Sequence, residues 1–285
     1  MAAFETLADT SELLAHLKDE RWRVVDCRFD LMHPQKGREA YLEAHIPGAV
    51  FADLNVDLAG SVRPDSGRHP LPEVDDLAAT WSRLGIRNDT QVIVYDESSG
   101  AMAARAWWLL RWLGHDRVAL LDGGFRRWQA LALPLEAGAV SVPPERFAPS
   151  PCNERVITTE ELERTCDSTT APRLFDARDA ARFRGDREPI DPVAGHIPGA
   201  TNMPFADSLN EDGTWKAPAA LRRIWSRALG EDPELPWGVM CGSGVTACHL
   251  ALSAVIAGYE EPRLYVGSWS EWIREPRRAV TTSAG

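Results

Sequence analysis

Lysine is scarce in this sequence, and positive charge is in deficit. Its 285 residues include 31 basic and 42 acidic side chains, and only three of the basic ones are lysines. The net charge of −11 repels phosphate groups, so neither nucleic acids nor anionic membranes are expected as partners. An apolar share of 44% and a charged share of 26% are typical of globular proteins, which excludes disorder as the main state.

Cysteine is also sparse, and its spacing suits neither disulfides nor zinc. The count of five is odd, and no Cys-x-x-Cys or Cys/His metal spacing occurs among Cys27, Cys152, Cys166, Cys241 and Cys248. The N-terminal residues include no basic segment followed by an apolar run, so no secretory signal is visible. Free thiols in a cytoplasmic protein are therefore expected.

One uncharged stretch requires a decision about membranes. Residues 235–259 contain no Asp, Glu, Lys or Arg over 25 positions, which is long enough to cross a bilayer, although they include His249. The stretch is interrupted by Pro236, Gly238 and the run Gly-Ser-Gly at 242–244. These residues favour a buried strand, a tight loop and a buried helix over a membrane span.

Three motifs occur twice in the same order. The paired segments are 25–28 with 175–178, 45–49 with 196–200, and 123–128 with 267–272. The second pair is identical, His-Ile-Pro-Gly-Ala in both copies, and the offsets are nearly constant at 150, 151 and 144 residues. A duplicated domain is therefore predicted.

A proline-containing segment separates the two copies. It has little hydrophobic periodicity and is typical of a semi-rigid linker. We predict a first domain at 1–138, a linker at 139–152 and a second domain at 153–285.

Each copy alternates short apolar runs with helical patterns. Asp9-x-x-Glu12 and Thr158-x-x-Glu161 predict capping boxes at helix starts, and Gly114 and Gly258 suit the ends of two long apolar helices. Strands are predicted at 23–25, 92–95 and 118–121, and at 173–175, 238–240 and 263–266 in the second copy. The fold class is therefore α/β, with a mostly parallel sheet flanked by helices on both faces in each domain.

Features present in both copies are expected to maintain the fold. Asp26-x-Arg28 and Asp176-x-Arg178 form one such pair, which we interpret as buried ion pairs. His45 and His196 form another, and we leave both histidines out of the site.

The copies differ most after their fourth strand, where Asp96 in the first aligns with Cys241 in the second. Cys241 is expected at the carboxyl end of a strand, the usual ligand site of open α/β sheets. Gly242 and Gly244 allow the loop N–H groups to turn inward, and a helix N-terminus follows. These donors stabilise a thiolate over a thiol and make Cys241 a candidate nucleophile.

Tandem domains with these motifs resemble the rhodanese-type sulfurtransferases over almost the whole chain. The resemblance implies an inactive first domain with Asp96 in the nucleophile's place, and a persulfide on Cys241 in the second. The loop Cys-Gly-Ser-Gly-Val-Thr at 241–246 is similar to that of 3-mercaptopyruvate sulfurtransferases. Its residues Gly242, Gly244, Val245 and Thr246 are then expected to bind the sulfur donor. Thiosulfate-preferring members carry Arg-Lys directly after the cysteine.

The resemblance also implies an arginine that binds the donor. Arg182 matches the family's active-site arginine, and the first copy has no arginine at that place. Its planar fork suits a carboxylate or sulfonate. Many mercaptopyruvate enzymes carry a second arginine where Ile190 stands here, and Arg184 and Arg187 are the candidates to replace it.

His69 and Ser243 match a pair that mercaptopyruvate enzymes carry. A neutral imidazole could accept a proton from Ser243 or from the donor. The family's supporting aspartate falls at Asn55, and an amide cannot stabilise an imidazolium as a charge would. Participation of His69 in proton transfer therefore stays open.

The expected function is sulfur transfer from a small anionic donor, 3-mercaptopyruvate or thiosulfate, to a thiol such as thioredoxin or glutathione. The covalent persulfide requires no cofactor and no metal. Three alternatives stay open: a thiosulfate-preferring rhodanese, a non-catalytic binding module and a cysteine-dependent phosphatase. The phosphatase loop Cys-x₅-Arg would need an arginine where Ala247 stands.

Overall fold

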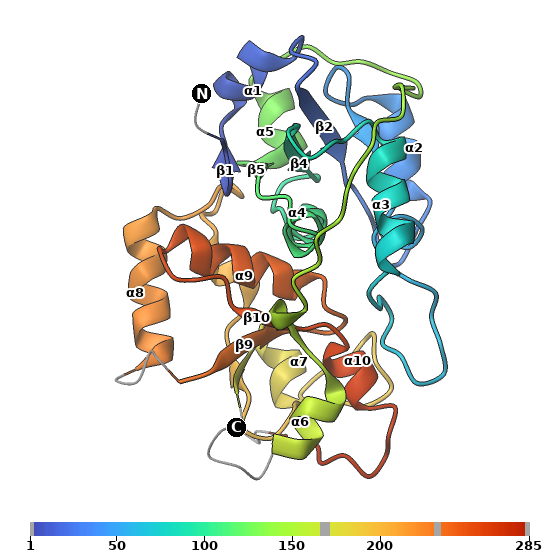
Figure 1. Ribbon diagram of the computed structural model, residues 1–285. Helices are drawn as coiled ribbons and strands as arrows, with labels where there is room; N and C mark the ends of the chain where they lie inside the picture. Colours follow the sequence, from blue (N-terminus) through green and yellow to red (C-terminus); the bar gives the residue numbers. More distant parts are fainter. Residues whose placement is uncertain (1–2, 166–171, 231–234, 283–285) are drawn as a thin grey trace. The chain divides into compact units, whose positions relative to one another are not determined.

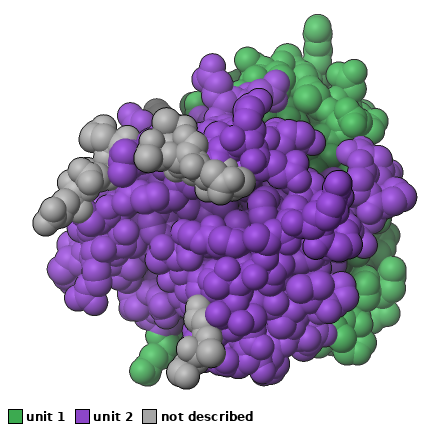
Figure 2. Space-filling model, turned by 90° about the horizontal axis from the view of Figure 1, so that it is seen from below, with its two compact units in different colours: residues 1–60, 71–152, 211–215 green, residues 61–70, 153–210, 216–285 purple. Residues whose placement is uncertain are grey.

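The computed structural model describes residues 3–165, 172–230 and 235–282. The chain divides into two compact units, which Figure 2 colours separately. Unit 1 comprises residues 1–60, 71–152 and 211–215, and unit 2 comprises 61–70, 153–210 and 216–285. Each unit thus includes a short segment from the other half of the sequence, which the boundaries 1–138, 139–152 and 153–285 do not anticipate. Those boundaries stay a prediction.

Each unit contains one five-stranded sheet in which all strand pairs are parallel (Figure 1). The strands of unit 1 are β1 (Leu7–Ala8), β2 (Trp22–Asp26), β3 (Val50–Phe51), β4 (Gln91–Tyr95) and β5 (Val118–Leu121). Those of unit 2 are β6 (Val156–Ile157), β7 (Arg173–Asp176), β8 (Thr201–Asn202), β9 (Trp237–Met240) and β10 (Arg263–Tyr265). The two sheets have the same order, β1-β5-β4-β2-β3 and β6-β10-β9-β7-β8. The duplication is therefore present in the topology as well as in the motifs.

Helices flank both sheets. Those of unit 1 are α1 (Thr10–His16), α2 (Lys36–Glu43), α3 (Val74–Arg83), α4 (Ala103–Trp112) and α5 (Gly124–Ala130). Those of unit 2 are α6 (Thr159–Thr165), α7 (Ala180–Arg184), α8 (Pro218–Leu229), α9 (Thr246–Ile256) and α10 (Ser268–Trp272), with 3₁₀ turns at Asn153–Arg155 and Phe205–Ser208. The predicted α/β fold with parallel sheets is confirmed.

Local signals place the helix ends where the sequence predicts them. The Asp9 side chain caps α1 by accepting the Glu12 N–H, and the Asp9 N–H donates to the Glu12 carboxylate. Thr158 accepts the Glu161 N–H ahead of α6 at 3.2 Å. Gly114 and Gly258 follow α4 and α9 with φ angles of 81° and 83°, the left-handed backbone for which glycine is suited.

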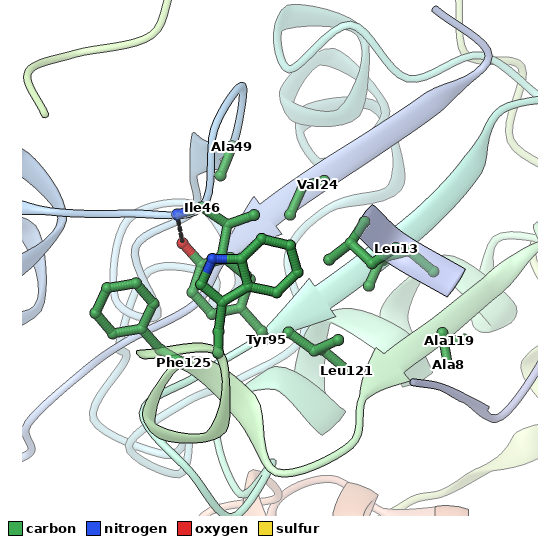
Figure 3. Packing of buried hydrophobic residues seen from close by; sticks show 11 residues of the cluster. Ala8, Leu13, Val24, Ile46, Ala49, Tyr95, Ala119, Leu121 and Phe125 are labelled. Carbon is green, nitrogen blue, oxygen red and sulfur yellow. Dashed lines mark hydrogen bonds between the residues drawn. The ribbon is translucent and has the colours of Figure 1, made fainter. Parts of the chain in front are cut away.

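The hydrophobic cores of the two units repeat position by position. In unit 1, Leu13 of α1, Ile46 and Tyr95 pack together, and the Ile46 N–H donates to the Tyr95 hydroxyl at 3.3 Å (Figure 3). The unit 2 cluster includes residues at the corresponding places, namely Leu162, Ile197, Met240, Trp269 and Trp272. Leucine and isoleucine recur at two of these places, whereas Tyr95 and Met240 differ.

The Asp-x-Arg pairs are buried in both units and make matching contacts. The Arg178 guanidinium donates to Asp176 at 2.7 Å and to the Gly195 carbonyl at 2.8 Å, and it lies 4.8 Å from the Trp269 ring centroid. Arg28 makes the equivalent ion pair with Asp26 at 2.7 Å. Both pairs join a strand end to the loop and helix beside it.

The paired histidines also have a structural role. The Nδ1–H of His45 donates to the Tyr41 carbonyl, and that of His196 donates to the Phe183 carbonyl, both at 2.7 Å. Each imidazole stacks on the ring of the same residue that accepts its hydrogen bond. Their exclusion from the site agrees with this geometry.

The uncharged stretch at 235–259 forms β9, the following loop and α9. Within the described ranges, no helix is both long and apolar enough to cross a membrane.

We expect Arg178→Ala to destabilise unit 2 by about 3–5 kcal/mol, because it leaves Asp176 buried without its counter-ion. Thermal melting measures the loss. Arg184→Ala is the matched control: its guanidinium is 43% exposed and pairs with Asp186 at the surface, so its melting temperature should barely change. An unchanged melting temperature for Arg178→Ala would contradict the scaffold role.

Candidate active site

Cys241 directly follows β9 and begins a five-residue loop that leads into α9 (Figure 1). Its side chain is buried, as are Gly242, Ser243, Gly244 and Val245, whereas Thr246 at the start of α9 is partly exposed. The cysteine thus lies between the carboxyl end of a parallel strand and a helix N-terminus, as predicted.

The beginning of α10 holds this loop by its backbone. The N–H of Trp269 donates to the Cys241 carbonyl at 3.0 Å, and the N–H of Ser270 donates to the Gly242 carbonyl at 2.9 Å. The Cys241 N–H donates in turn to the Ser268 hydroxyl at 3.1 Å. Strand end, loop and α10 therefore form one hydrogen-bonded assembly.

Ser268 is held in a left-handed conformation with φ of 52°, which is unusual for a residue with a Cβ. Its hydroxyl accepts from Cys241 and donates to the Tyr265 carbonyl at 2.9 Å. The equivalent residue of unit 1 is Gly124, with φ of 58° and no side chain to make these bonds. Ser268 therefore fixes the Cys241 backbone in a way that unit 1 lacks.

The corresponding loop of unit 1 can be compared with this one, because the carboxylate of Asp96 is bound inside it. The backbone N–H groups of Ser98 and Gly100 donate to one carboxylate oxygen of Asp96, and those of Met102 and Ala103 donate to the other, at 2.7–3.2 Å. Burial nevertheless raises the pKa of Asp96, since desolvation outweighs these four hydrogen bonds. The loop is an anion-binding nest in the copy that carries an aspartate.

The segment 66–69 belongs to unit 2 and is anchored on α10. The Gly67 N–H donates to a Glu271 carboxylate oxygen at 3.2 Å, and the Arg68 N–H donates to the Ser270 hydroxyl at 3.1 Å. The next residue, His69, is buried, and its Nδ1 lies 2.7 Å from the Ser243 hydroxyl. The structure therefore brings together the predicted His69 and Ser243.

The guanidinium group of Arg182 is already bound by two carboxylates, those of Glu188 and Asp191. Its Nε lies 3.0 Å from both oxygens of Glu188, and its Nη2 lies 3.0 Å from Asp191. Asp191 also pairs with the Arg68 guanidinium. The donor-binding role of Arg182 stays a prediction. Of its nitrogens, Nη1 is the one that these hydrogen bonds do not use.

The pKa values of Glu188 and Asp191 shift in opposite directions. Burial alone would raise the pKa of Glu188, but hydrogen bonds from Arg182 and from the Asp191 and Ile190 N–H groups outweigh it and lower the pKa. Burial raises the pKa of Asp191, and the nearby Arg68 and Arg182 charges only partly oppose it. Hydrogen bonds therefore outweigh desolvation at Glu188, whereas desolvation prevails at Asp191.

Gly242 lies against both guanidinium groups. A Cβ at this position would lie 3.0 Å from Arg68 Nη2 and 3.5 Å from Arg182 Nη2. Gly244 has φ of 75°, and a Cβ there would lie 2.5 Å from the Val266 carbonyl oxygen. The missing side chain of Gly242 leaves space for the two guanidinium groups, and Gly244 allows the left-handed backbone turn.

The remaining predictions meet different outcomes. Arg184 and Arg187 pair with Asp186 and Asp179 at the surface, away from Gly242 as far as the described contacts go. Asn55 is exposed on unit 1.

The other cysteines do not resemble Cys241. Cys248 is buried in α9, where its thiol donates to the Gly244 carbonyl at 3.2 Å. Cys27 is also buried, and desolvation raises its pKa, whereas Cys152 is partly exposed. Cys166 lies outside the described residues. Among the described residues, no cluster of His, Cys, Asp or Glu could hold a metal ion.

Sequence reasoning missed several residues at this site: Arg68, Glu188, Asp191, Ser268, Ser270 and Glu271. The available signal for Arg68 was its place beside His69. For Ser268, the signal was a serine where the first copy has a glycine.

Comparison with known protein families settles the class. The model of the rhodanese-like domain matches residues 9–131 and again 158–275. The chain belongs to the rhodanese family. Both copies of the internal repeat are thus rhodanese domains.

Full-length relatives are sulfurtransferases. The chain is 47% identical to "Probable 3-mercaptopyruvate sulfurtransferase" of Pseudomonas aeruginosa, over 97% of this chain and 98% of that protein. It is 41% identical to "Putative thiosulfate sulfurtransferase SseB" of Mycobacterium tuberculosis, over 90% and 89%. The crystal structure of SseA from Escherichia coli, described with the rhodanese fold of 3-mercaptopyruvate sulfotransferases, superposes with a TM-score of 0.82 at 33% identity, over 94% of this chain and all of that one. This rhodanese-family chain is a sulfurtransferase.

Two glycine variants separate donor binding from folding. Gly242→Ala should raise the apparent KM for an anionic sulfur donor several-fold with little change in melting temperature, since the Cβ displaces only a flexible guanidinium. Gly244→Ala should lower the melting temperature, because a left-handed residue with a Cβ costs about 1–2 kcal/mol before the Val266 contact is counted. Donor titration and thermal melts measure both. The reverse pattern would contradict the roles assigned to the two glycines.

Proposed function

We propose that this chain transfers a sulfane sulfur from 3-mercaptopyruvate to a thiol acceptor through a persulfide on Cys241. The acceptor in the cell is a small or protein thiol such as glutathione or thioredoxin, and the location is cytoplasmic. The absence of a disulfide-like cysteine spacing supports that location.

The observation that carries the proposal is the carboxylate held in the loop of unit 1. In Asp96 the oxygens stand two bonds beyond Cβ, and in a cysteine persulfide the outer sulfur stands two bonds beyond Cβ as well. Gly100 and Gly244 occupy matching places with φ of 77° and 75°. A persulfide on Cys241 would thus present its anionic outer sulfur where Asp96 presents its oxygens.

The first half-reaction forms this persulfide. The Cys241 thiolate attacks the sulfur of the donor, the donor's carbon–sulfur bond breaks, and its electron pair stays on the departing enolate of pyruvate. The proton of the donor's thiol moves to that enolate and completes pyruvate. Loop N–H groups from Gly242 to Thr246 stabilise the charge that remains on the outer sulfur.

We assign the movement of that proton to Ser243 and His69. A hydroxyl 2.7 Å from an imidazole nitrogen can donate to the enolate and recover a proton from the ring. Arg182 fits the donor's carboxylate, because the Cys241 loop lies beside its guanidinium.

The second half-reaction returns the enzyme to its starting state. The thiolate of the acceptor attacks the outer sulfur, the sulfur–sulfur bond breaks, and Cys241 leaves as a thiolate. The acceptor departs as a persulfide, so sulfur and electrons balance without a cofactor.

Thiosulfate is the second candidate donor, favoured by the name of the Mycobacterium tuberculosis relative. It would form the same persulfide with sulfite as the leaving group. A phosphatase lacks support, because Ala247 stands where the Cys-x₅-Arg loop needs its arginine. A purely binding role is disfavoured by the cysteine in a complete anion-binding loop.

We expect Cys241→Ser to abolish turnover with either donor, because a serine alkoxide is scarcely accessible near neutral pH and oxygen cannot form a persulfide. Mass spectrometry after exposure to the donor should detect one added sulfur atom on the Cys241 peptide of the wild type. Cys152→Ser is the matched control and should keep both the activity and the added sulfur. Substantial turnover by Cys241→Ser would remove Cys241 from the mechanism.

Steady-state kinetics at matched concentrations decide the donor. We expect a higher kcat/KM with 3-mercaptopyruvate than with thiosulfate, because no Arg-Lys pair follows Cys241 to bind the sulfonate-like group. The opposite ranking would retain the persulfide and identify thiosulfate as the donor.

A further inference from the structure

Two guanidinium groups, those of Arg68 and Arg182, converge beside the loop that carries Cys241, although Ile190 stands where many mercaptopyruvate enzymes carry their second arginine. Arg68 Nη2 would lie 3.0 Å from a Cβ on Gly242, closer than either Nη of Arg182 at 3.5 and 3.7 Å. Gly242 is the residue that follows Cys241. Arg68 is thus the nearest side-chain cation that the described residues place at this glycine.

Arg182 uses more of its guanidinium nitrogens in hydrogen bonds to carboxylates than Arg68 does. Arg182 uses Nε and Nη2 on Glu188 and Asp191. Arg68 uses only Nη1, on Asp191, and its Nε is buried without a hydrogen-bond partner in the described structure. The Arg68 side chain is 24% exposed, against 11% for Arg182. The described contacts leave Nη2 of Arg68, the group nearest Gly242, to donate to an incoming anion.

Charge balance makes Arg68 necessary if an anion binds here. Arg182 is neutralised mainly by Glu188, its bidentate partner, and Arg68 is the cation that balances Asp191. A donor carboxylate adds one negative charge beside Asp191. Arg178 lies 3.5 Å from Glu188, so that carboxylate has a second cation, but without Arg68 only Arg182 would remain to balance both Asp191 and the donor. Removal of Arg68 should therefore weaken donor binding by more than the loss of a single contact.

The backbone of Arg68 is held in place for such a task. Its N–H donates to Ser270, and Gly67 before it donates to Glu271. A Cβ on Gly67 would lie 2.7 Å from the Gly267 carbonyl, so the segment packs closely on the start of α10. His69 after it contacts Ser243. One short segment thus presents both a cation and the serine's partner to the loop.

The replacements suggested by the sequence do not fill this place. Arg187 is 67% exposed and lies 3.8 Å from Asp179, and Arg184 pairs with Asp186 two residues away. Ile190 is apolar and 37% exposed.

We infer that Arg68 is a donor-binding residue, which together with Arg182 grips the carboxylate of a 2-oxo acid thiol and sets the preference for that donor class. The inference rests on the proposed function and adds a residue to it. Asp191 acts as the shared counter-ion that holds the two guanidinium groups side by side.

The test compares Arg68→Met, Arg68→Lys and the matched surface control Arg187→Met in the full-length chain. Arg68→Met should raise the KM for 3-mercaptopyruvate at least about tenfold, as expected for a lost charge-assisted hydrogen bond. Arg68→Lys should fall between Arg68→Met and the wild type, because an ammonium keeps the charge without the planar fork. Arg187→Met should match the wild type.

A second measurement separates contact with the donor from a structural role. Cys241 is first loaded with sulfur from inorganic polysulfide, which has no carboxylate, and discharge to glutathione is then followed. Arg68→Met should discharge at the wild-type rate and keep its melting temperature. An unchanged KM for 3-mercaptopyruvate would overturn the inference, as would an equal loss in discharge and in melting temperature.

The two proposals can fail separately. A wild-type chain that accepts thiosulfate and not 3-mercaptopyruvate would overturn both the proposed donor and the carboxylate grip. A wild-type chain that uses 3-mercaptopyruvate, with Arg68→Met equally efficient, would overturn the role of Arg68 alone.

Discussion

The first turn of α10 donates backbone hydrogen bonds to the carbonyls of Cys241 and Gly242, and the site is arranged around that contact. The same turn accepts the Arg68 N–H through the Ser270 side chain and the Gly67 N–H through Glu271. A single short helix therefore sets the separation between the nucleophile loop and the segment that carries Arg68 and His69. Two of these four bonds join backbone to backbone, and in the other two a backbone N–H donates to a side chain of α10.

The duplicated fold shows what the scaffold requires and what the chemistry adds. Both units keep the buried Asp-x-Arg ion pair, the stacked histidine and the strand order. Among the differences between the units, the loop after the fourth strand carries Asp96 in unit 1 and Cys241 in unit 2, and the last helix begins with Gly124 and Ser268 respectively. In unit 1 the loop N–H groups bind the carboxylate of Asp96, which is part of the amino-acid side chain. In the proposed mechanism the corresponding group of unit 2 is the outer sulfur of a persulfide, which Cys241 gains and loses in each cycle.

Local sequence was enough to predict much of the fold. Caps at Asp9 and Gly114 and the apolar runs of the strands depend on neighbouring residues, so a pattern along the chain reveals them. The place of Cys241 followed for the same reason, since strand, loop and helix are consecutive. Arg68 and Asp191 escaped prediction because they are 123 residues apart, and Gly67 and Glu271 are 204 apart. Such contacts depend on how the chain crosses between its halves, which no local pattern records.

The segment 61–70 has a consequence for how the chain can be divided. It lies within the first half of the sequence yet belongs to unit 2, whereas the loop with Cys241 comes from the second half. A fragment beginning at residue 153 would retain the nucleophile and lose both Arg68 and His69. Any truncated form that is meant to preserve these contacts therefore has to include residues 61–70 together with the second half of the chain.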